Sequence, residues 1–345
     1  MITKQSLGKG EIAEESLRYY FVSQGYFTVR SVPFNYKNFD VTDVDLWLYM
    51  KSSSLARERT CVDVKRKRTP QAMERVFWTK GLRNVLGVDT AMIATTDNRN
   101  ETREFGAAHD VTVLHGDFLQ RVIKNFSTPA TRITEEQFIN DLKKPCVIDA
   151  GIVWYRFYRN LKAILLTDLN FNGCNMLLVR IKFLFEEYLA TNKTSIASVR
   201  LLYAAVTYFL VTLDYTSQLI THLETAGRQS SLADGFRYGD AGRERTEEIV
   251  DMALHLLAET AKSDLFSRSK LKSEIDAQSS EYPAEILAEH FAKSEVLKHL
   301  FAQACEWEKM TYEAQLPMPH QCSSEQKALL GLLCDFMKID RRQII

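Results

Sequence analysis

The first 126 residues alternate between segments with the two-residue period of β-strands and segments with the 3.6-residue period of amphipathic helices. The alternation predicts helices over residues 11–24, 69–87, 102–110 and 117–126, and strands over residues 26–34, 43–50, 59–67, 88–97 and 111–116. Within the second helix, Thr69 is the expected N-cap and Pro70 the first helical residue. The order αβββαβαβα indicates a mixed sheet with helices on both faces.

From about residue 127 the pattern becomes almost entirely helical. Helices are expected over residues 154–169, 176–190, 195–225, 243–263, 284–315 and 324–339, and a Thr134–Gln137 capping box starts a shorter one. The segment Arg228–Gly242 is rich in Ser and Gly and predicts a long loop. A chain of 345 residues is long enough for two domains. We therefore expect an α/β domain over residues 1–128 and an all-helical domain over residues 129–345.

Several features bound the location and partners of the protein. The N-terminal residues lack the apolar core of a signal peptide, and the apolar stretch Leu201–Leu213 is too short to span a bilayer, which predicts a buried helix. The six cysteines show no C-x-x-C or zinc spacing, as expected of reduced thiols in a cytoplasmic protein without membrane attachment. Residues 1–126 contain 19 Lys and Arg against 15 Asp and Glu, a net charge of +4 that weakly favours a polyanionic partner.

Two predicted strands carry charges where a buried strand would be apolar. Residues two apart in a strand point the same way, so Asp63 and Lys65 share one face of the strand over residues 59–67. If the strand over residues 43–50 is its antiparallel neighbour, Asp45 lies across from Asp63. Two close carboxylates repel unless a cation lies between them, and a divalent cation suits their oxygen ligands. With Lys65 to orient or deprotonate a water or to stabilise the phosphate, these groups make up a hydrolytic site for phosphodiesters.

The same three residues also fit a simpler interpretation. Asp45, Asp63 and Lys65 would then lie on the exposed faces of edge strands and form ion pairs across the ladder. D-x-K alone is a weak signal, and the three residues by themselves do not exclude this alternative.

The order of the surrounding segments favours the site. The helix and strand of "GKGEIAEESLRYYFVSQGYFTVRS", the strands "VDLWL" and "CVDVKRKR", and the closing stretch "MIATTDNRNETREFGAAHDVTVLHGDFLQRVI" follow one another at characteristic spacings. Over about residues 7–124 the chain thereby resembles the PD-(D/E)xK nuclease superfamily, in particular archaeal Holliday-junction resolvases and Mrr-type restriction endonucleases.

The resemblance implies a restriction-endonuclease-like α/β fold and a metal-dependent DNA endonuclease. Its catalytic residues would be Asp45, Asp63, Lys65 and Glu14, with Mg²⁺ or Mn²⁺ held by Asp45, Asp63 and Glu14. It also implies DNA as the partner, a possible homodimer, and a role in prokaryotic restriction, phage defence or repair. The helical domain, which resembles no family that we identify, would supply substrate choice, assembly or a protein partner. The alternative function is a catalytically silent nuclease fold that binds nucleic acid or serves as a scaffold.

Two acidic positions have competitors. The residue before Asp45 is Val44 instead of the proline of the family name, and Asp43 shares the face of Asp45, so it competes as the first acid. Glu15 competes with Glu14. Helical phase places Glu14 with Leu17 and Phe21 on the core face, and we expect Glu15 to face water.

The cations after the D-x-K strand predict contacts with phosphates. Arg66, Lys67 and Arg68 end the strand, and Arg75 lies on the following helix, which the resemblance places beside the active cleft. A solvated helix face is the alternative for each of them. Gln71 is near enough in sequence to reach the site. For two histidines, His109 and His115, structural roles are expected.

Overall fold

The computed structural model describes residues 7–37, 39–69, 71–126, 129, 131–143, 154–260 and 268–345. The chain divides into two compact units. Unit 1 comprises Met1–Thr167, Ser195–Tyr208 and Gln303–Leu316, and unit 2 comprises Asp168–Thr194, Phe209–Ala302 and Pro317–Ile345. This division differs from the boundary expected at residue 128, which itself lies outside the described residues. Two later stretches of the helical region belong to the unit that holds the sheet.

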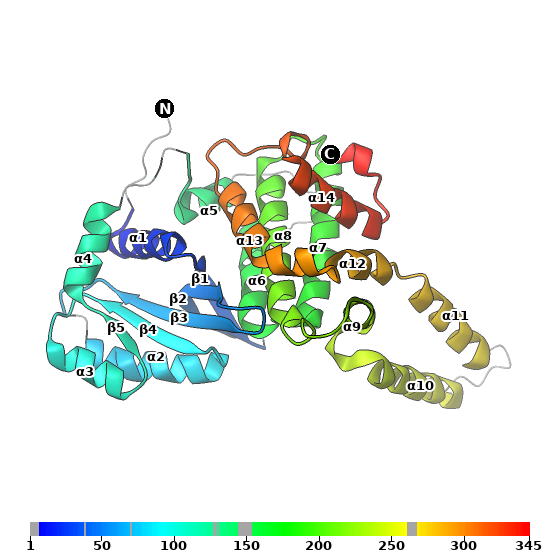
Figure 1. Cartoon of the computed structure of the whole chain (residues 1–345), viewed down its shortest axis with the longest axis horizontal. Coiled ribbons are helices and arrows are strands. Elements are labelled where there is room, and N and C mark those ends of the chain that lie inside the picture. Colours follow the sequence, from blue (N-terminus) through cyan, green and yellow to red (C-terminus); the bar gives the residue numbers. More distant parts are fainter. Residues whose placement is uncertain are drawn as a thin grey trace. The chain divides into compact units, whose positions relative to one another are not determined.

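Unit 1 is built on a five-stranded mixed sheet (Figure 1). The strands run in the order β1-β2-β3-β4-β5 and have the bounds β1 (Phe27–Tyr36), β2 (Phe39–Lys51), β3 (Arg57–Lys65), β4 (Thr90–Thr95) and β5 (Thr112–Leu114). The β1–β2 and β2–β3 pairs are antiparallel, and the β3–β4 and β4–β5 pairs are parallel. The mixed sheet is thus confirmed, and β3 is its central strand.

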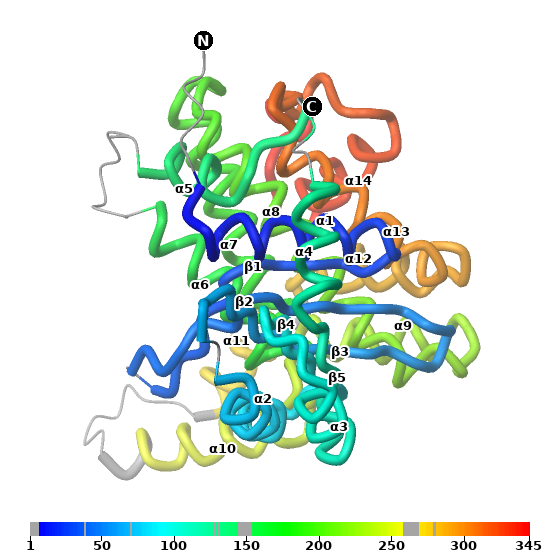
Figure 2. Tube along the Cα trace, turned by 90° about the vertical axis from the view of Figure 1, so that its left-hand side faces the viewer, coloured from blue at the N-terminus to red at the C-terminus, as the bar shows by residue number. Residues whose placement is uncertain are grey.

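Helices lie on both faces of this sheet. α1 (Lys9–Ser23) and α4 (Gly116–Asn125) cover one face, whereas α2 (Ala72–Leu86) lies on the other with α3 (Asn100–Ala108) beside it (Figures 1 and 2). α5 (Glu135–Lys143) packs with α6 (Trp154–Thr167), which packs against β1. Unit 1 is completed by the first part of α8 (Ile196–Ser217) and the last part of α13 (Ser294–Thr311).

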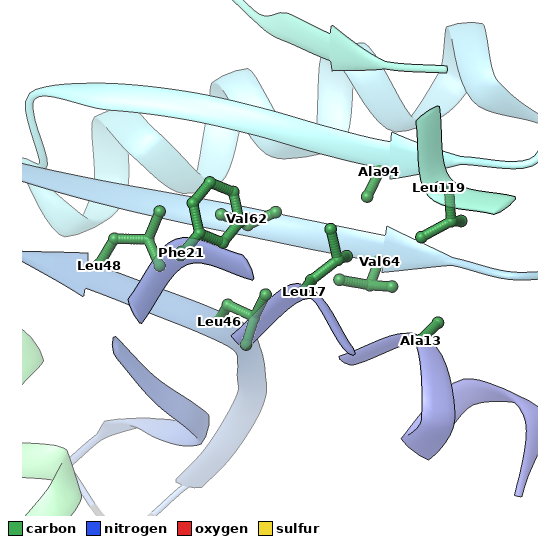
Figure 3. Packing of buried hydrophobic residues seen from close by; sticks show 9 residues of the cluster. All are labelled: Ala13, Leu17, Phe21, Leu46, Leu48, Val62, Val64, Ala94 and Leu119. Carbon is green, nitrogen blue, oxygen red and sulfur yellow. The ribbon is translucent and has the colours of Figure 1, made fainter. Parts of the chain in front are cut away.

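The apolar core between α1 and the sheet follows the strand alternation (Figure 3). Leu17 of α1 packs among alternate residues of β2 and β3, which include Leu46 and Val62. Burial of each such side chain contributes about 1.5–3 kcal/mol to folding. Because the core takes every second residue of β3, Asp63 and Lys65 point away from it.

The sequence predicts the end of α1 correctly and the start of α2 incorrectly. α1 stops as predicted at Gly25, whose φ of 89° is accessible to glycine without a steric cost, and the Tyr26 N–H donates back to the Phe21 carbonyl. The expected cap of α2 was wrong. Its N-cap is Gln71 with a φ of 48°, and this left-handed residue separates Thr69 from the helix. Pro70 lies outside the described residues.

Unit 2 is helical, as the sequence predicts. It contains the last part of α8 and the first part of α13, together with α7 (Phe171–Ala190), α9 (Thr225–Tyr238), η1 (Gly239–Ala241), α10 (Gly242–Thr260), α11 (Arg268–Ser280), α12 (Ala284–Phe291), η2 (Pro319–Gln321), α14 (Ser324–Phe336) and η3 (Arg341–Gln343). The loop expected over Arg228–Gly242 was wrong, because α9 runs through it to Tyr238. Tertiary packing overrides the Gly and Ser content: Phe236 is buried, and the Arg228 guanidinium donates to the Ala292 carbonyl at 2.8 Å.

Among the described residues, α8 is the one helix long and apolar enough to cross a membrane. Its most apolar window is 94% buried inside the protein, as in the core helix of a soluble protein. The buried helix expected around Leu201–Leu213 is therefore confirmed.

Candidate active site

The candidate site lies where β2 and β3 part. Their ladder ends at the pair Leu46 and Val62, and beyond it the Asp45 carboxylate accepts the Val64 N–H at 2.6 Å. Lys65 Nζ lies 3.2 Å from Asp45 Oδ2 and 3.2 Å from Asp63 Oδ1. The structure therefore brings together the two acids and the lysine that the sequence analysis singled out. They lie on the central strand and its neighbour and not on edge strands, but the ion pairs that the simpler interpretation expected are present.

The surroundings of the Asp45 carboxylate disfavour its ionised form. Burial raises its pKa above the ordinary value, and the neighbouring Asp63 carboxylate raises it further. Lys65 and the Val64 N–H act in the opposite direction without cancelling the rise. A further positive charge near Asp45 would stabilise its ionised form.

The geometry separates the two candidates for the first acid. Asp43 Oδ1 and Oδ2 accept hydrogen bonds from the guanidinium of Arg159 on α6, at 3.1 and 3.2 Å, and Asp40 contacts the same guanidinium. Asp45 instead contacts Lys65, so it is the acid that lies beside the D-x-K strand.

Glu14 is paired with Arg30 and is near enough to Asp45 to be affected by its charge. Burial raises its pKa, the Asp45 carboxylate adds to the rise, and Arg30 Nη2 opposes it from 2.9 Å. The expectation that Glu15 faces water was wrong, because Glu15 is 1% exposed and accepts a hydrogen bond from Arg30 Nη1 at 2.5 Å. Helical phase failed here because α1 is buried on a second face, which is charged instead of apolar.

The expected phosphate contacts divide into two groups. Lys67 and Arg68 are exposed, and Arg66 is half-buried and donates to the Lys9 carbonyl at 3.1 Å. Arg75 is engaged within the site, because its Nε donates to Asp63 Oδ2 at 2.8 Å and its Nη2 donates to Asp63 Oδ1. In this structure Arg75 therefore neutralises an acid of the site.

Three polar residues near these elements lie apart from the acids. Gln71 donates from Nε2 to Glu74 Oε1 at 3.4 Å. His109 caps α3 and packs edge-on against Phe105 with ring centroids 4.5 Å apart, and His115 is the N-cap of α4. The positions of both histidines suit structural roles.

A buried network of charges in unit 1 was missed by sequence reasoning. Arg18 Nη2 lies 2.5 Å from Glu308, and Lys162 Nζ lies 2.9 Å from Glu135. Arg30 joins this network to Glu14, because it donates to both Glu14 and Glu15, and Glu15 lies 3.7 Å from Arg18 Nη1. One signal in the sequence was available: Arg18 directly follows Leu17 in the core-facing part of α1. Its partner Glu308 could not be found in the same way, because it lies 290 positions away.

The oxygen donors suit a divalent cation by their chemistry. Asp45 and Asp63 share one ammonium group, and burial together with mutual repulsion raises the pKa of both Asp45 and Glu14, so added positive charge is favoured there. In the described part of the chain, however, no three His, Cys, Asp or Glu side chains converge as a ready metal-binding group. The cations Lys65 and Arg75 take the carboxylate oxygens instead.

Comparisons of the chain with protein-family models, with curated proteins and with solved structures gave no match in any of the three.

Proposed function

We propose that the protein is a metal-dependent endonuclease that hydrolyses DNA phosphodiester bonds. The observation that carries the proposal is the position of Lys65 Nζ, 3.2 Å from carboxylate oxygens of both Asp45 and Asp63. Two acids on adjacent strands with one amine between them provide the charges that such a hydrolysis needs.

Each residue of the site has a distinct role in this proposal. Asp45, Asp63 and Glu14 would hold Mg²⁺ or Mn²⁺. Held there, such a cation would supply positive charge to polarise a phosphoryl oxygen and to acidify water. Lys65 orients the attacking water or stabilises the charge on the phosphate, and it lies beside Asp63 because alternate residues of β3 share a face.

The substrate and the setting come from the resemblance to PD-(D/E)xK nucleases. DNA is the proposed substrate, with Arg66, Lys67 and Arg68 next to the catalytic strand as candidate phosphate contacts. We further propose a cytoplasmic role in prokaryotic restriction, phage defence or repair. The helical region would provide substrate choice, a protein partner or a homodimer contact.

Nuclease assays on matched variants test this function. We expect the purified protein to cut plasmid, linear or branched DNA with Mg²⁺ or Mn²⁺. Asp63→Ala, Asp45→Ala and Lys65→Ala should each lower the rate by about a hundredfold or more, because each removes a charge from the reaction centre. Asp43→Ala is the matched control, since it removes a carboxylate from the same strand but contacts Arg159 instead of Lys65. It should retain the rate within about threefold.

Two results would count against hydrolysis at this site. One is the absence of cutting of any DNA by folded protein with either metal. The other is equal cutting by wild type, Asp63→Ala and Lys65→Ala. An RNA duplex assayed in parallel distinguishes DNA from RNA as the substrate.

One observation favours a catalytically silent nucleic-acid-binding protein as the second candidate. Both oxygens of Asp63 accept hydrogen bonds from Arg75, an arrangement that neutralises the acid without a metal. Filter binding of DNA that is retained by Asp63→Ala, together with the absence of cutting, would favour this alternative.

A further inference from the structure

The Arg75 guanidinium makes a forked contact with Asp63 inside the candidate site. Its Nε donates to Oδ2 at 2.8 Å, and its Nη2 donates to Oδ1, which Lys65 also approaches to 3.2 Å. A forked arginine–carboxylate contact is among the stronger polar interactions in proteins. Asp63 is 6% exposed, so an unpaired charge on its carboxylate would be costly.

α2 positions Arg75 for this contact and leaves its side chain partly exposed to solvent. Arg75 lies in the first turn of the helix, where its N–H donates to the Gln71 carbonyl at 3.2 Å. Its side chain is 25% exposed, and the guanidinium lies 5.2 Å from the ring centre of Trp78, which is 45% exposed. The guanidinium therefore contacts both the buried acid and an exposed aromatic side chain, and it is itself partly open to solvent.

The charges of the site favour an exchange of cations. Asp45 and Asp63 are balanced by Lys65 and Arg75, and Glu14 is paired with Arg30. A divalent cation entering with both Lys65 and Arg75 in place would leave excess positive charge in a partly buried space. It would also meet the Arg75 guanidinium at both oxygens of Asp63.

We propose that Arg75 is an internal competitor of the divalent cation for Asp63, so that metal binding and release of Arg75 are a single event. This inference rests on the proposed metal-dependent function. It assigns Arg75 a role different from the phosphate contact expected from the sequence. Without metal, Arg75 stabilises the buried acid, and the contact lowers the affinity of the site for the cation.

Calorimetric titration with Mn²⁺ compares wild type with two matched variants. Arg75→Gln removes the competitor and should bind Mn²⁺ about tenfold more tightly than wild type, equivalent to about 1.4 kcal/mol. Arg83→Gln removes the same charge from the same helix two turns further on and should bind as wild type does. Arg75→Lys keeps the charge but loses the fork, so its affinity should lie between those of wild type and Arg75→Gln.

Tryptophan fluorescence provides a second readout that does not depend on activity. In the wild type, Mg²⁺ should change the emission of Trp78 as the guanidinium leaves its ring. The change should be absent from both Trp78→Phe and Arg75→Gln. Circular dichroism of each variant confirms that it is folded.

The outcomes separate this inference from the proposed function. If Arg75→Gln and Arg83→Gln tighten Mn²⁺ binding equally, or neither does, while Asp63→Asn abolishes binding, Arg75 is no competitor but the metal site stands. If neither the wild type nor any variant binds Mn²⁺, or if Asp63→Asn binds Mn²⁺ as the wild type does, the proposed metal-dependent function is wrong. The inference about Arg75 is then wrong as well.

Discussion

The Glu135 carboxylate is buried yet strongly acidic. Burial by itself raises the pKa, but Lys162, Arg18 and hydrogen bonding from Tyr312 outweigh it and bring the pKa of Glu135 to about 2. The pKa of Glu308, paired with Arg132 and Arg18, is lowered as well. Both acids therefore stabilise the fold in their ionised forms.

Acid should accordingly destabilise the protein through this network. A carboxylate with a lowered folded pKa contributes stability that is present above its unfolded pKa, about 4.5 for Glu135. That contribution is lost as the pH falls from about 4.5 towards 2. Denaturant unfolding at several pH values should show the decline, and Glu135→Gln should show a shallower decline over the same range. Equal slopes for the two proteins would contradict the role of Glu135.

Single residues of the site could be predicted where the strand period alone decides. Asp63 and Lys65 share a face because they are two apart, and that inference needs no tertiary information. The fork of Arg75 on Asp63 could not be predicted, because it depends on where α2 begins. Glu15 was placed wrongly because hydrophobic periodicity detects apolar faces and does not detect a buried charged one.

At the level of elements, two glycines in helices of unit 1 differ in what surrounds them. A Cβ on Gly106 of α3 would lie 2.4 Å from Val113 Cγ2 and 2.7 Å from the Val111 carbonyl oxygen. A Cβ on Gly81 of α2 would meet nothing within 4 Å. Gly106 is thus required by the close approach of α3 to the residues around β5, whereas Gly81 is not.

Alanine substitutions at these glycines should act in opposite directions. Gly106→Ala should lower the free energy of unfolding by about 1–3 kcal/mol, because backbone and side chain must move to admit the methyl group. Gly81→Ala should raise it by roughly 0.5–1 kcal/mol through helix propensity. Urea titration measures both changes. A stabilising Gly106→Ala would show that α3 lies further from β5 than described.

The order of the helices and strands could be predicted from the sequence, but the residues at which they begin and end were predicted less well. The αβββαβαβα order is confirmed because each segment is short, strongly periodic and flanked by turn residues. α9 was missed because Gly235 and the serines of that segment weaken helix propensity, while packing of Gly235 against Phe171 stabilises the helix. Similarly, the helix expected over residues 284–315 breaks between Phe291 and Ser294.

At the scale of the whole molecule, the two units interleave along the chain. Unit 1 includes Gln303–Leu316, and some of the acids that pair with its buried arginines come from beyond residue 128. Arg18 contacts Glu308, and Arg30 contacts Glu136. Composition marks where helices predominate, but it carries no information on which helices pack together, so the division could not be predicted from the sequence.

A fragment of residues 1–128 should not fold stably. It would lack Glu308 and Glu136, which pair with Arg18 and Arg30, and it would also lack α6, which packs against β1. Loss of one partner of a buried ion pair costs about 3–5 kcal/mol. Such a loss is a large part of the roughly 5–15 kcal/mol that stabilises a domain. Circular dichroism should show no cooperative melting of the fragment. A cooperative transition near that of the full chain would instead establish residues 1–128 as an autonomous domain.

The pairing of Arg18 with Glu308 also sets an order of events during protein synthesis. A ribosome that has passed residue 128 has already produced every strand of the sheet, but about 180 further codons separate it from Glu308. At about 5–20 residues per second, that interval is roughly 10–40 seconds. For that time Arg18 lacks both Glu308 and the Tyr312 ring over which its guanidinium packs. We expect the packing around Arg18 to form only after Glu308 has been synthesised.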